Sequence, residues 1–359
     1  MAGLTATAEP VAAVHDVALY DLDGVVYVAY QPVPHAAESL ASALQLYGMR
    51  AGFVTNNAAR PAGEVAQTLR SMGIAAQDAD VVTSAQAAAR VLDERLEPGA
   101  RVLAVGGPGV AWALDERGFT AVFSADDDPA AVVTGYGPQV GWPELAEASL
   151  AIGRGVLWVA TNTDATIPSP RGRVLGNGAL VAALQFATKV EPVVAGKPAP
   201  PLMLESVERT HADRPLFVGD RLDTDIEGAT RSGLASMLVL TGVSDWWDLI
   251  DAPVELRPTY LGADLRALLE PAPPTTIEQT GDRWVASCGD AEVMLQVSAR
   301  GSAVEASVAG PAQWLPEGAT GIDCFTSSGL DLVRCFVALG WSLADGEAVA
   351  VGKAVVTSR

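Results

Sequence analysis

Short apolar segments alternate with amphipathic ones along most of the chain, and this alternation limits the fold more than any other feature. An apolar run at residues 17–21 ends in a glycine turn, residues 36–47 have helical periodicity, and residues 49–55 are apolar again. Repeated strand–helix units of this kind pack as a parallel sheet with helices on both faces. The sequence therefore predicts an α/β protein with a doubly wound, Rossmann-like parallel sheet.

The order of these segments predicts several domains. A second strand–helix series begins near residue 100 and ends near Val190, after which the first pattern resumes. We therefore expect a core formed by residues 15–83 and 191–269, with an α/β cap domain, residues 84–190, inserted into it. A Pro-rich linker at 270–275 then leads to a small α+β C-terminal unit, residues 276–359, with a helix near 329–340 and a last strand near 347–356.

Charge and composition exclude several classes of protein. The chain has 43 Asp and Glu residues against 23 Lys and Arg, a formal charge of −20, so it repels a nucleic-acid backbone. No apolar run approaches the roughly 18 residues of a membrane helix, and the first 16 residues lack the pattern of a signal peptide. Three cysteines without C-x-x-C spacing favour a reducing compartment. We expect a cytoplasmic protein without nucleic-acid or membrane partners.

The pair Asp21 and Asp23 follows the first apolar segment. Residues two apart on a strand share a face, and two carboxylates on one face repel each other. Such a pair needs a cation, and with Mg²⁺ present one carboxylate can act as nucleophile while the other acts as acid or base. Taken alone, the pattern more often marks a solvated turn after a strand.

Three further polar segments follow predicted strands. Thr55, Asn56 and Asn57 offer a hydroxyl, amides and backbone N–H groups to phosphoryl oxygens, although the same residues suit a helix N-cap. Lys197 lies between Gly196 and Pro198, and residues 219–225 contain three carboxylates. Because the carboxyl ends of parallel strands lie at one edge of a sheet, all four segments can meet in one crevice.

In this order the segments resemble a known set of motifs. The sequences DLDGVVY, VTNN, GKP and GDRLDTD, at residues 21–27, 54–57, 196–198 and 219–225, are similar to the four motifs of the haloacid dehalogenase-like phosphohydrolases. The long insertion resembles the type 2 (C2a) cap of the nitrophenyl-phosphatase branch, which includes phosphatases of pyridoxal phosphate, phosphoglycolate and glycerol phosphate. The resemblance covers about residues 15–269 and implies a phosphatase that uses Mg²⁺.

The resemblance also implies roles for individual residues. Asp21 would be the nucleophile that forms an aspartyl-phosphate, Asp23 the general acid and base, and Lys197 the cation beside them. Thr55, Asn56 and Asn57 would bind the phosphoryl group. Mg²⁺ would be held by Asp21, the backbone carbonyl of Asp23 and Asp220, with Asp225 supporting them from behind, and Asp223 would matter less.

The cap suggests a substrate. Relatives that act on pyridoxal phosphate have aromatic and imidazole side chains where this chain has Thr166 and Ile167, so we expect these residues, with Asn177, to contact a small aliphatic ester. Glycerol 3-phosphate, a metabolite of glycerophospholipid metabolism, fits best. Alternatives are phosphoglycolate, nitrophenyl phosphate, a sugar or nucleotide monophosphate, or a non-catalytic role as a phosphoester-binding regulatory protein. The acid Asp23 favours an enzyme.

Two further features have mainly structural interpretations. The glycine-rich segment at residues 105–110 lacks G-x-G-x-x-G and is predicted to be a tight turn between a strand and a helix. The C-terminal unit is similar to a degraded acetyltransferase module but has no R-x-x-G-x-G loop for a pyrophosphate. Packing, regulation or a homodimer through the cap or the C-terminal unit are the roles that we expect.

Overall fold

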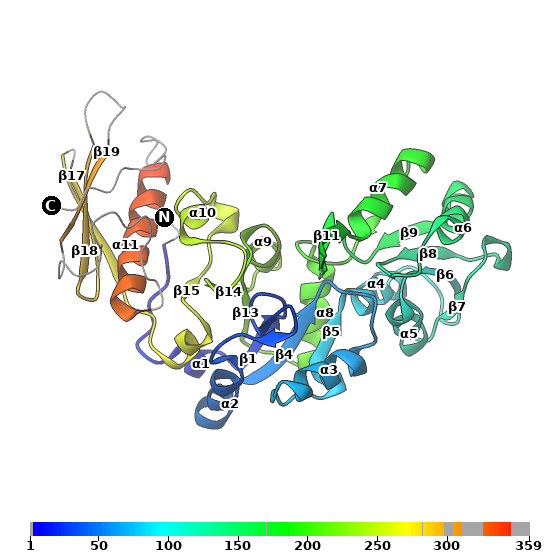
Figure 1. Cartoon of the computed structure of the whole chain (residues 1–359), viewed down its shortest axis with the longest axis horizontal. Helices are drawn as coiled ribbons and strands as arrows, with labels where there is room; N and C mark the ends of the chain where they lie inside the picture. Colours follow the sequence, from blue (N-terminus) through cyan, green and yellow to red (C-terminus); the bar gives the residue numbers. More distant parts are fainter. Residues whose placement is uncertain (1–2, 170, 282, 298–303, 310–325, 346–359) are drawn as a thin grey trace. The chain divides into compact units, whose positions relative to one another are not determined.

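The computed structural model describes residues 3–169, 171–281, 283–297, 304–309 and 326–345 (Figure 1). Contacts divide the chain into two compact units, residues 1–18, 23–50 and 214–359 in one and residues 19–22 and 51–213 in the other. Both contain alternating strands and helices, and the predicted α/β fold is confirmed. The domain boundaries expected at residues 84, 190 and 270 stay predictions.

A six-stranded sheet contains the strands that precede most of the motif residues. Its order is β15 (Tyr260–Gly262), β14 (Ala235–Val239), β13 (Pro215–Gly219), β1 (Val17–Asp21), β4 (Arg50–Thr55) and β5 (Val81–Thr83). The pairs β13–β14, β14–β15 and β4–β5 are parallel. Every residue of β1 is buried, as expected of a central strand with helices on both faces.

A second, five-stranded sheet lies within residues 101–194. Its order is β12 (Val193–Val194), β9 (Leu157–Ala160), β8 (Ala131–Thr134), β6 (Arg101–Val105) and β7 (Thr120–Val122), and all its pairs are parallel. The sequence pattern assigns residues 193–194 to the resumed core, whereas the strand that they form, β12, pairs with β9 of this sheet. Two residues are too short for a periodicity, so pairing with β9 decides where the strand goes.

Among the described residues of this α/β region, ten α-helices flank the sheets or connect them. They are α1 (Val11–Val14), α2 (Ala36–Tyr47), α3 (Ala62–Ser71), α4 (Ser84–Asp93), α5 (Pro108–Glu116), α6 (Trp142–Gly153), α7 (Asn177–Thr188), α8 (Pro200–Thr210), α9 (Glu227–Arg231) and α10 (Trp246–Ile250). Local signals set their ends: Thr83 and Gln86 form a capping box at the start of α4, and Gly48, at φ +72°, ends α2.

The glycine-rich segment at residues 105–110 is the predicted turn between β6 and α5. A Cβ on Gly107 or Gly109 would lie 2.5 Å from the carbonyl oxygen of Ala59 or Ala58, and the Gly109 N–H donates to the Ala59 carbonyl at 3.1 Å. The absence of a Cβ at these glycines therefore allows their backbone to lie close to the loop that follows β4.

Two antiparallel hairpins interrupt the α/β pattern. One pairs β2 (Tyr27–Val28) with β3 (Gln31–Pro32), and the other pairs β10 (Thr166–Ser169) with β11 (Gly172–Leu175). The second hairpin contains two of the residues expected to contact substrate. This hairpin could not be predicted from the sequence, because Pro168 interrupts a strand pattern of only four residues.

The C-terminal unit is an antiparallel four-stranded sheet with a helix, α11 (Ser327–Asp345), against it (Figure 1). Its strands are β16 (Thr275–Thr280), β17 (Arg283–Cys288), β18 (Ala291–Val297) and β19 (Val304–Ala309). The helix expected near 329–340 is confirmed, whereas the strand expected near 347–356 lies outside the described residues. Within the described ranges no helix has the length and apolar character needed to cross a membrane.

Candidate active site

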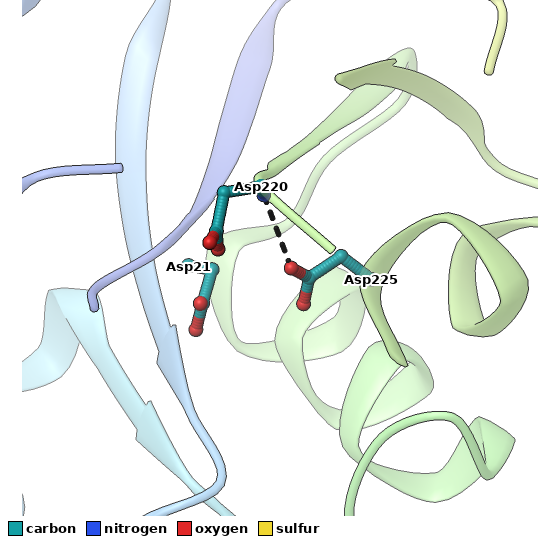
Figure 2. A group of neighbouring side chains, drawn as sticks. All are labelled: Asp21, Asp220 and Asp225. Carbon is teal, nitrogen blue, oxygen red and sulfur yellow. Dashed lines mark hydrogen bonds between the residues drawn. The ribbon is translucent and has the colours of Figure 1, made fainter. Parts of the chain in front are cut away.

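Three carboxylates meet at one point of the structure (Figure 2). Asp21 is the last residue of β1, Asp220 follows β13 directly, and Asp225 belongs to a short π-helical segment, Leu222–Ile226. One oxygen atom of each lies within 4.8 Å of the others, and all three side chains are buried. Buried like charges at this separation repel strongly unless a cation compensates them. The arrangement therefore favours a bound cation.

The loop after β14 fixes the carboxylate of Asp220. The backbone N–H of Val243 donates to Oδ2 of Asp220 at 2.7 Å, and the N–H of Ser244 donates to the Asp220 carbonyl at 3.0 Å. A Cβ on Gly24 or Gly242 would lie 2.3 or 1.9 Å from the same Oδ2 atom. Only glycine at both positions leaves room for the carboxylate, so the backbone around it is built to this side chain.

Asp225 and Asp223 have different environments although both belong to the fourth motif. The carboxylate of Asp225 accepts the backbone N–H groups of Asp220 and Arg221 at 3.2 and 3.1 Å, which fixes the turn after β13. Asp223 is exposed and pairs with Arg221, and the hydrogen bonds from that guanidinium lower the pKa of Asp223. Asp225 thus holds the turn that carries Asp220, while Asp223 belongs to the surface.

Lys197 supplies a buried positive charge next to Asp21. Its Nζ atom lies 2.6 Å from Oδ1 of Asp21, and its side chain is only 3% exposed. The side chain of Asn56 holds the backbone of Lys197 from both sides: Oδ1 accepts the Lys197 N–H at 2.8 Å, and Nδ2 donates to the Lys197 carbonyl at 3.2 Å. The ammonium is thereby presented from a fixed backbone.

Asn56 also joins the loop after β4 to the loop after β9. Its Nδ2 lies 3.3 Å from both carboxylate oxygens of Asp164, and its carbonyl accepts Nδ2 of Asn162 at 2.7 Å and Oγ of Ser84 at 2.6 Å. Asn177, at the start of α7, donates in turn to the Asn162 carbonyl at 2.7 Å. Sequence reasoning overlooked Asn162 and Asp164, because their partner Asn56 lies more than 100 residues away.

The other residues of the second motif form a tight turn. Oγ1 of Thr55 accepts the backbone N–H of Asn57 at 3.1 Å, and Oδ1 of Asn57 accepts the N–H of Ala59 at 2.8 Å. The hydroxyl hydrogen of Thr55 can still be donated to another acceptor. This geometry suits Thr55 as a donor at the end of β4, while the carbonyl oxygen of the Asn57 side chain stabilises the turn.

Asp23 differs from Asp21 in exposure. The side chain of Asp21 is buried against Lys197, whereas Asp23 is exposed. Gly24, the residue after Asp23, has φ +93°. Its backbone N–H donates to the carbonyl of Tyr27, in β2, at 2.8 Å. The two carboxylates therefore have the environments that a fixed nucleophile and an accessible acid require.

Thr166 and Ile167 lie on β10, and Thr166 is exposed. They pair with Leu175 and Val174 of β11, so they point to opposite sides of the hairpin. The hydrogen bonds and ion pairs among the described residues do not join either side chain to Asp21 or Lys197. The structure brings Thr55, Asn56 and Lys197 together, and places these two residues on a separate hairpin.

The donors at the carboxylate cluster fit magnesium. Mg²⁺ is a hard cation that binds carboxylate and other oxygen ligands in preference to nitrogen or sulfur. The side-chain donors of Asp21, Asp220 and Asp225 are all carboxylate oxygens, and each is buried. A divalent cation here would offset a charge that Lys197 alone cannot neutralise.

Family models and relatives agree with this geometry. Residues 18–120 match the model described as haloacid dehalogenase-like hydrolase, and residues 194–268 match one described as HAD-hydrolase-like. A D-glycerol 3-phosphate phosphatase of Mycobacterium tuberculosis is 52% identical over 254 residues, 71% of each chain. An acid sugar phosphatase of Staphylococcus aureus is 36% identical over 69% of this chain and 94% of its own.

Solved structures show the same similarity over more of the chain. The glycerol phosphate phosphatase of Mycobacterium tuberculosis in complex with magnesium matches with a TM-score of 0.77 and 42% identity, covering 93% of this chain and 92% of that one. A p-nitrophenyl phosphatase from Archaeoglobus fulgidus matches with a TM-score of 0.65 and 29% identity, covering 71% of this chain and 98% of its own.

Proposed function

Because the chain belongs to the haloacid dehalogenase-like hydrolases, we propose that it is the phosphatase of a small polyol phosphate, glycerol 3-phosphate, and uses Mg²⁺. The named relatives are phosphatases, and this chain is a phosphoric monoester hydrolase. The observation that carries the chemistry is the 2.6 Å contact of Lys197 with Asp21, next to two further buried carboxylates. The relative named for D-glycerol 3-phosphate supports the substrate.

The reaction proceeds in two steps on Asp21. Its carboxylate attacks phosphorus, a bond forms between an Asp21 oxygen and phosphorus, and the bond from phosphorus to the glycerol oxygen breaks. Asp23 donates its proton to that leaving oxygen. In the second step Asp23 takes a proton from water, which attacks phosphorus and releases phosphate from Asp21. The buried, paired Asp21 and the exposed Asp23 suit these roles.

The surrounding groups lower the repulsion between a carboxylate and a dianionic ester. Lys197 places its ammonium at Asp21, and Thr55 donates its hydroxyl to a phosphoryl oxygen, with the backbone of Asn56 and Asn57 beside it. Mg²⁺, when bound, would supply positive charge that offsets the negative charge of the ester. Its proposed holders are the carboxylates of Asp21 and Asp220 and the backbone carbonyl of Asp23. Asp225 has an indirect role, because its carboxylate accepts the backbone N–H of Asp220 and so holds that residue in position.

A phosphate-release assay tests this function directly. The purified chain is offered both enantiomers of glycerol 3-phosphate, phosphoglycolate, nitrophenyl phosphate, a hexose phosphate and a nucleoside monophosphate. We expect the highest kcat/KM for glycerol 3-phosphate, complete loss of turnover in excess chelator, and recovery when Mg²⁺ is restored. A preference for another ester refutes the substrate, turnover in metal-free buffer refutes the metal site, and no turnover of any ester supports the non-catalytic alternative.

The hairpin residues test where the leaving group binds. Because Thr166 and Ile167 point to opposite sides of the hairpin, only one of the variants Thr166→Phe and Ile167→Phe should place its ring where the leaving group is proposed to bind. We expect that variant to lower kcat/KM for glycerol 3-phosphate about tenfold and to leave nitrophenyl phosphate within about threefold. The measurement is steady-state kinetics with both esters.

A control adds the same aromatic bulk elsewhere. Leu150, 54% exposed on α6, is replaced by Phe and should leave both substrates unchanged. If both hairpin variants lower the two substrates equally while remaining folded, or neither variant changes them, the hairpin does not contact the leaving group. Asn177 would then keep only its role in holding the loop at Asn162.

We also propose a cytoplasmic location for this reaction. The described cysteines, Cys288 and Cys335, are free thiols, which a reducing compartment maintains. Burial raises the pKa of Cys288 to about 11 and of Cys335 to about 12, so both stay protonated and packed. Treatment with a thiol reagent under native conditions should leave both thiols unmodified, and rapid labelling would contradict this.

A homodimer through the cap or the C-terminal unit stays a prediction, which sedimentation tests.

A further inference from the structure

A short segment connects Asp220 to the helix α10. Residues 241–245 lie between β14 and α10, and Val243 and Ser244 donate their backbone N–H groups to the carboxylate and the carbonyl of Asp220. The next residue, Asp245, caps α10 by accepting the N–H groups of Trp247 and Asp248 at 2.8 and 3.0 Å. The position of α10 therefore sets where the donors to Asp220 lie.

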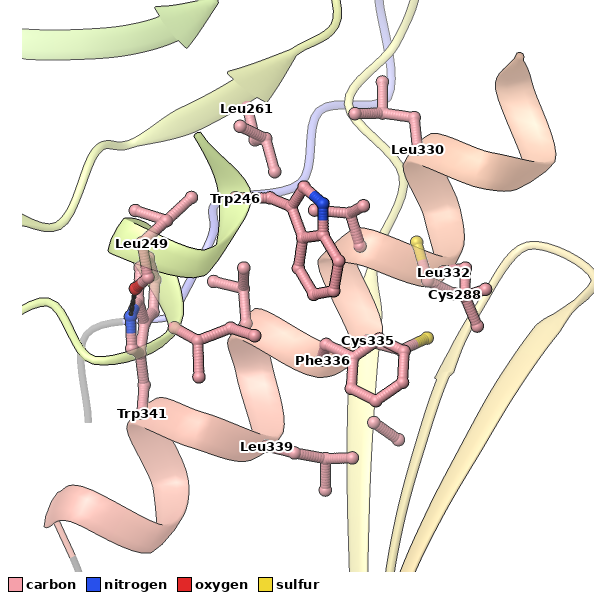
Figure 3. Close-up of a cluster of buried hydrophobic side chains, with 14 of the residues drawn as sticks. Trp246, Leu249, Leu261, Cys288, Leu330, Leu332, Cys335, Phe336, Leu339 and Trp341 are labelled. Carbon is pink, nitrogen blue, oxygen red and sulfur yellow. Dashed lines mark hydrogen bonds between the residues drawn. The ribbon is translucent and has the colours of Figure 1, made fainter. Parts of the chain in front are cut away.

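Helix α10 packs directly on α11 of the C-terminal unit (Figure 3). The indole Nε1 of Trp341 donates to the Leu249 carbonyl at 2.8 Å, and a Cβ on Gly340 would lie 2.7 Å from the Ile250 carbonyl oxygen. The rings of Trp246 and Phe336 lie 5.8 Å apart. The contact is close enough that a single methyl group at position 340 must displace α10 or α11.

A second contact joins the C-terminal ends of the same two helices. The guanidinium of Arg257, which is buried, donates to the Ala252 carbonyl at 3.0 Å and to the Asp345 carboxylate at 2.9 Å. Ala252 follows α10 and Asp345 ends α11. The two helices are thus connected at both ends of their contact.

The same apolar cluster reaches the segment that carries Asp225. Leu222 and Ile226, on either side of that residue, are buried in one cluster with Trp246, Phe336 and Trp341. Helix α11 packs on α10, and its apolar residues share one cluster with Leu222 and Ile226. This cluster therefore includes or adjoins the two segments that position Asp220, one through its carboxylate and one through the turn that Asp225 holds. Neither contact depends on a side chain that would touch substrate.

From this chain of contacts we propose that the C-terminal unit supports the metal site indirectly, with Gly340 and Trp341 of α11 as positioning residues for Asp220. The acid sugar phosphatase and the p-nitrophenyl phosphatase match about 70% of this chain over 94% and 98% of their own length, so their chains have little room for such a unit. In this chain α10 buries Trp246, Leu249 and Ile250 in a cluster that α11 completes. The inference rests on the proposed role of Asp220 as a metal ligand.

Direct binding of Mg²⁺ to the full chain tests the proposal. Gly340→Ala and Trp341→Phe are titrated with Mg²⁺ alone by calorimetry, at a temperature where circular dichroism shows them folded. We expect each to raise the Kd for Mg²⁺ about three- to tenfold, while kcat at saturating Mg²⁺ stays within about twofold of the original chain. Trp341→Phe removes only the indole N–H and the second ring, so it keeps the test open if Gly340→Ala does not fold.

Two further variants separate the possible failures. Val132→Ala removes two methyl groups from a fully buried position on β8, in a separate apolar cluster, so it should lower the Tm but leave the Kd for Mg²⁺ unchanged. If its Kd rises as much as that of the α11 variants, the effect is general destabilisation and the proposal is wrong. It is equally wrong if the α11 variants bind Mg²⁺ normally. Asp220→Asn should lose Mg²⁺ binding, and normal binding there would instead refute the proposed metal site.

Discussion

Asparagine at position 21 is expected to abolish phosphate release from every ester, lowering kcat at least about a thousandfold, because an amide cannot form the covalent bond to phosphorus. The substitution keeps the size of the side chain and leaves an oxygen acceptor for the ammonium of Lys197, 2.6 Å away in the original chain. We therefore expect the fold to survive. Steady-state phosphate release measures the loss, and acid quenching with a labelled ester measures the missing phosphoenzyme.

Asp223→Asn is the matched control for this variant. It removes a carboxylate from the same neighbourhood of the sequence, but Asp223 is exposed and pairs with Arg221. Phosphate release should stay within about twofold of the original chain, since the effect of a surface ion pair is small. If Asp21→Asn kept a tenth of the original kcat, with mass spectrometry excluding deamidation, another residue would have to be the nucleophile.

For Asp23→Asn we expect a loss that depends on the leaving group. Glycerol leaves as a strongly basic alkoxide and needs a proton, so kcat for glycerol 3-phosphate should fall about a hundred- to ten-thousandfold. Nitrophenolate leaves without much help, so its release in the first step should fall far less. The measurement is the burst of nitrophenol before steady state, compared with the rate for glycerol 3-phosphate.

The burst separates the two roles of Asp23. In the proposed mechanism the variant forms the phosphoenzyme from nitrophenyl phosphate and then hydrolyses it slowly, because the same carboxylate activates water. A nitrophenol burst followed by slow turnover is the expected trace. Equal losses in both steps and for both esters would show that Asp23 matters for folding or binding instead of proton transfer.

Much of the site follows from local sequence, because its residues end strands. Asp21 and Thr55 are the last residues of β1 and β4, and Asp220 follows β13 directly. An apolar strand is visible in a sequence, and the edge where its carboxyl end lies is a property of the fold class. The spacing of Asp21 and Asp23 predicts shared chemistry but not their unequal exposure, which depends on the packing around Gly24 and Lys197.

Contacts between distant segments could not be predicted. The amide of Asn56 holds the backbone of Lys197 across 141 positions of sequence, and no periodicity or local propensity encodes such a pair. The packing of Trp341 on Leu249 belongs to the same class, since an apolar helix only indicates that it is buried and not against what. The side chains that carry chemistry were visible in the sequence, whereas those that hold them in place were not.

The pairing of strand β12 with β9 has a consequence for how Lys197 is held in place. Because Val193–Val194 pairs with β9, the lysine that neutralises the nucleophile is attached to the five-stranded sheet, three residues beyond β12. The ammonium that pairs with Asp21 is therefore fixed from two directions, by the attachment of its backbone to β12 and by the side-chain amide of Asn56.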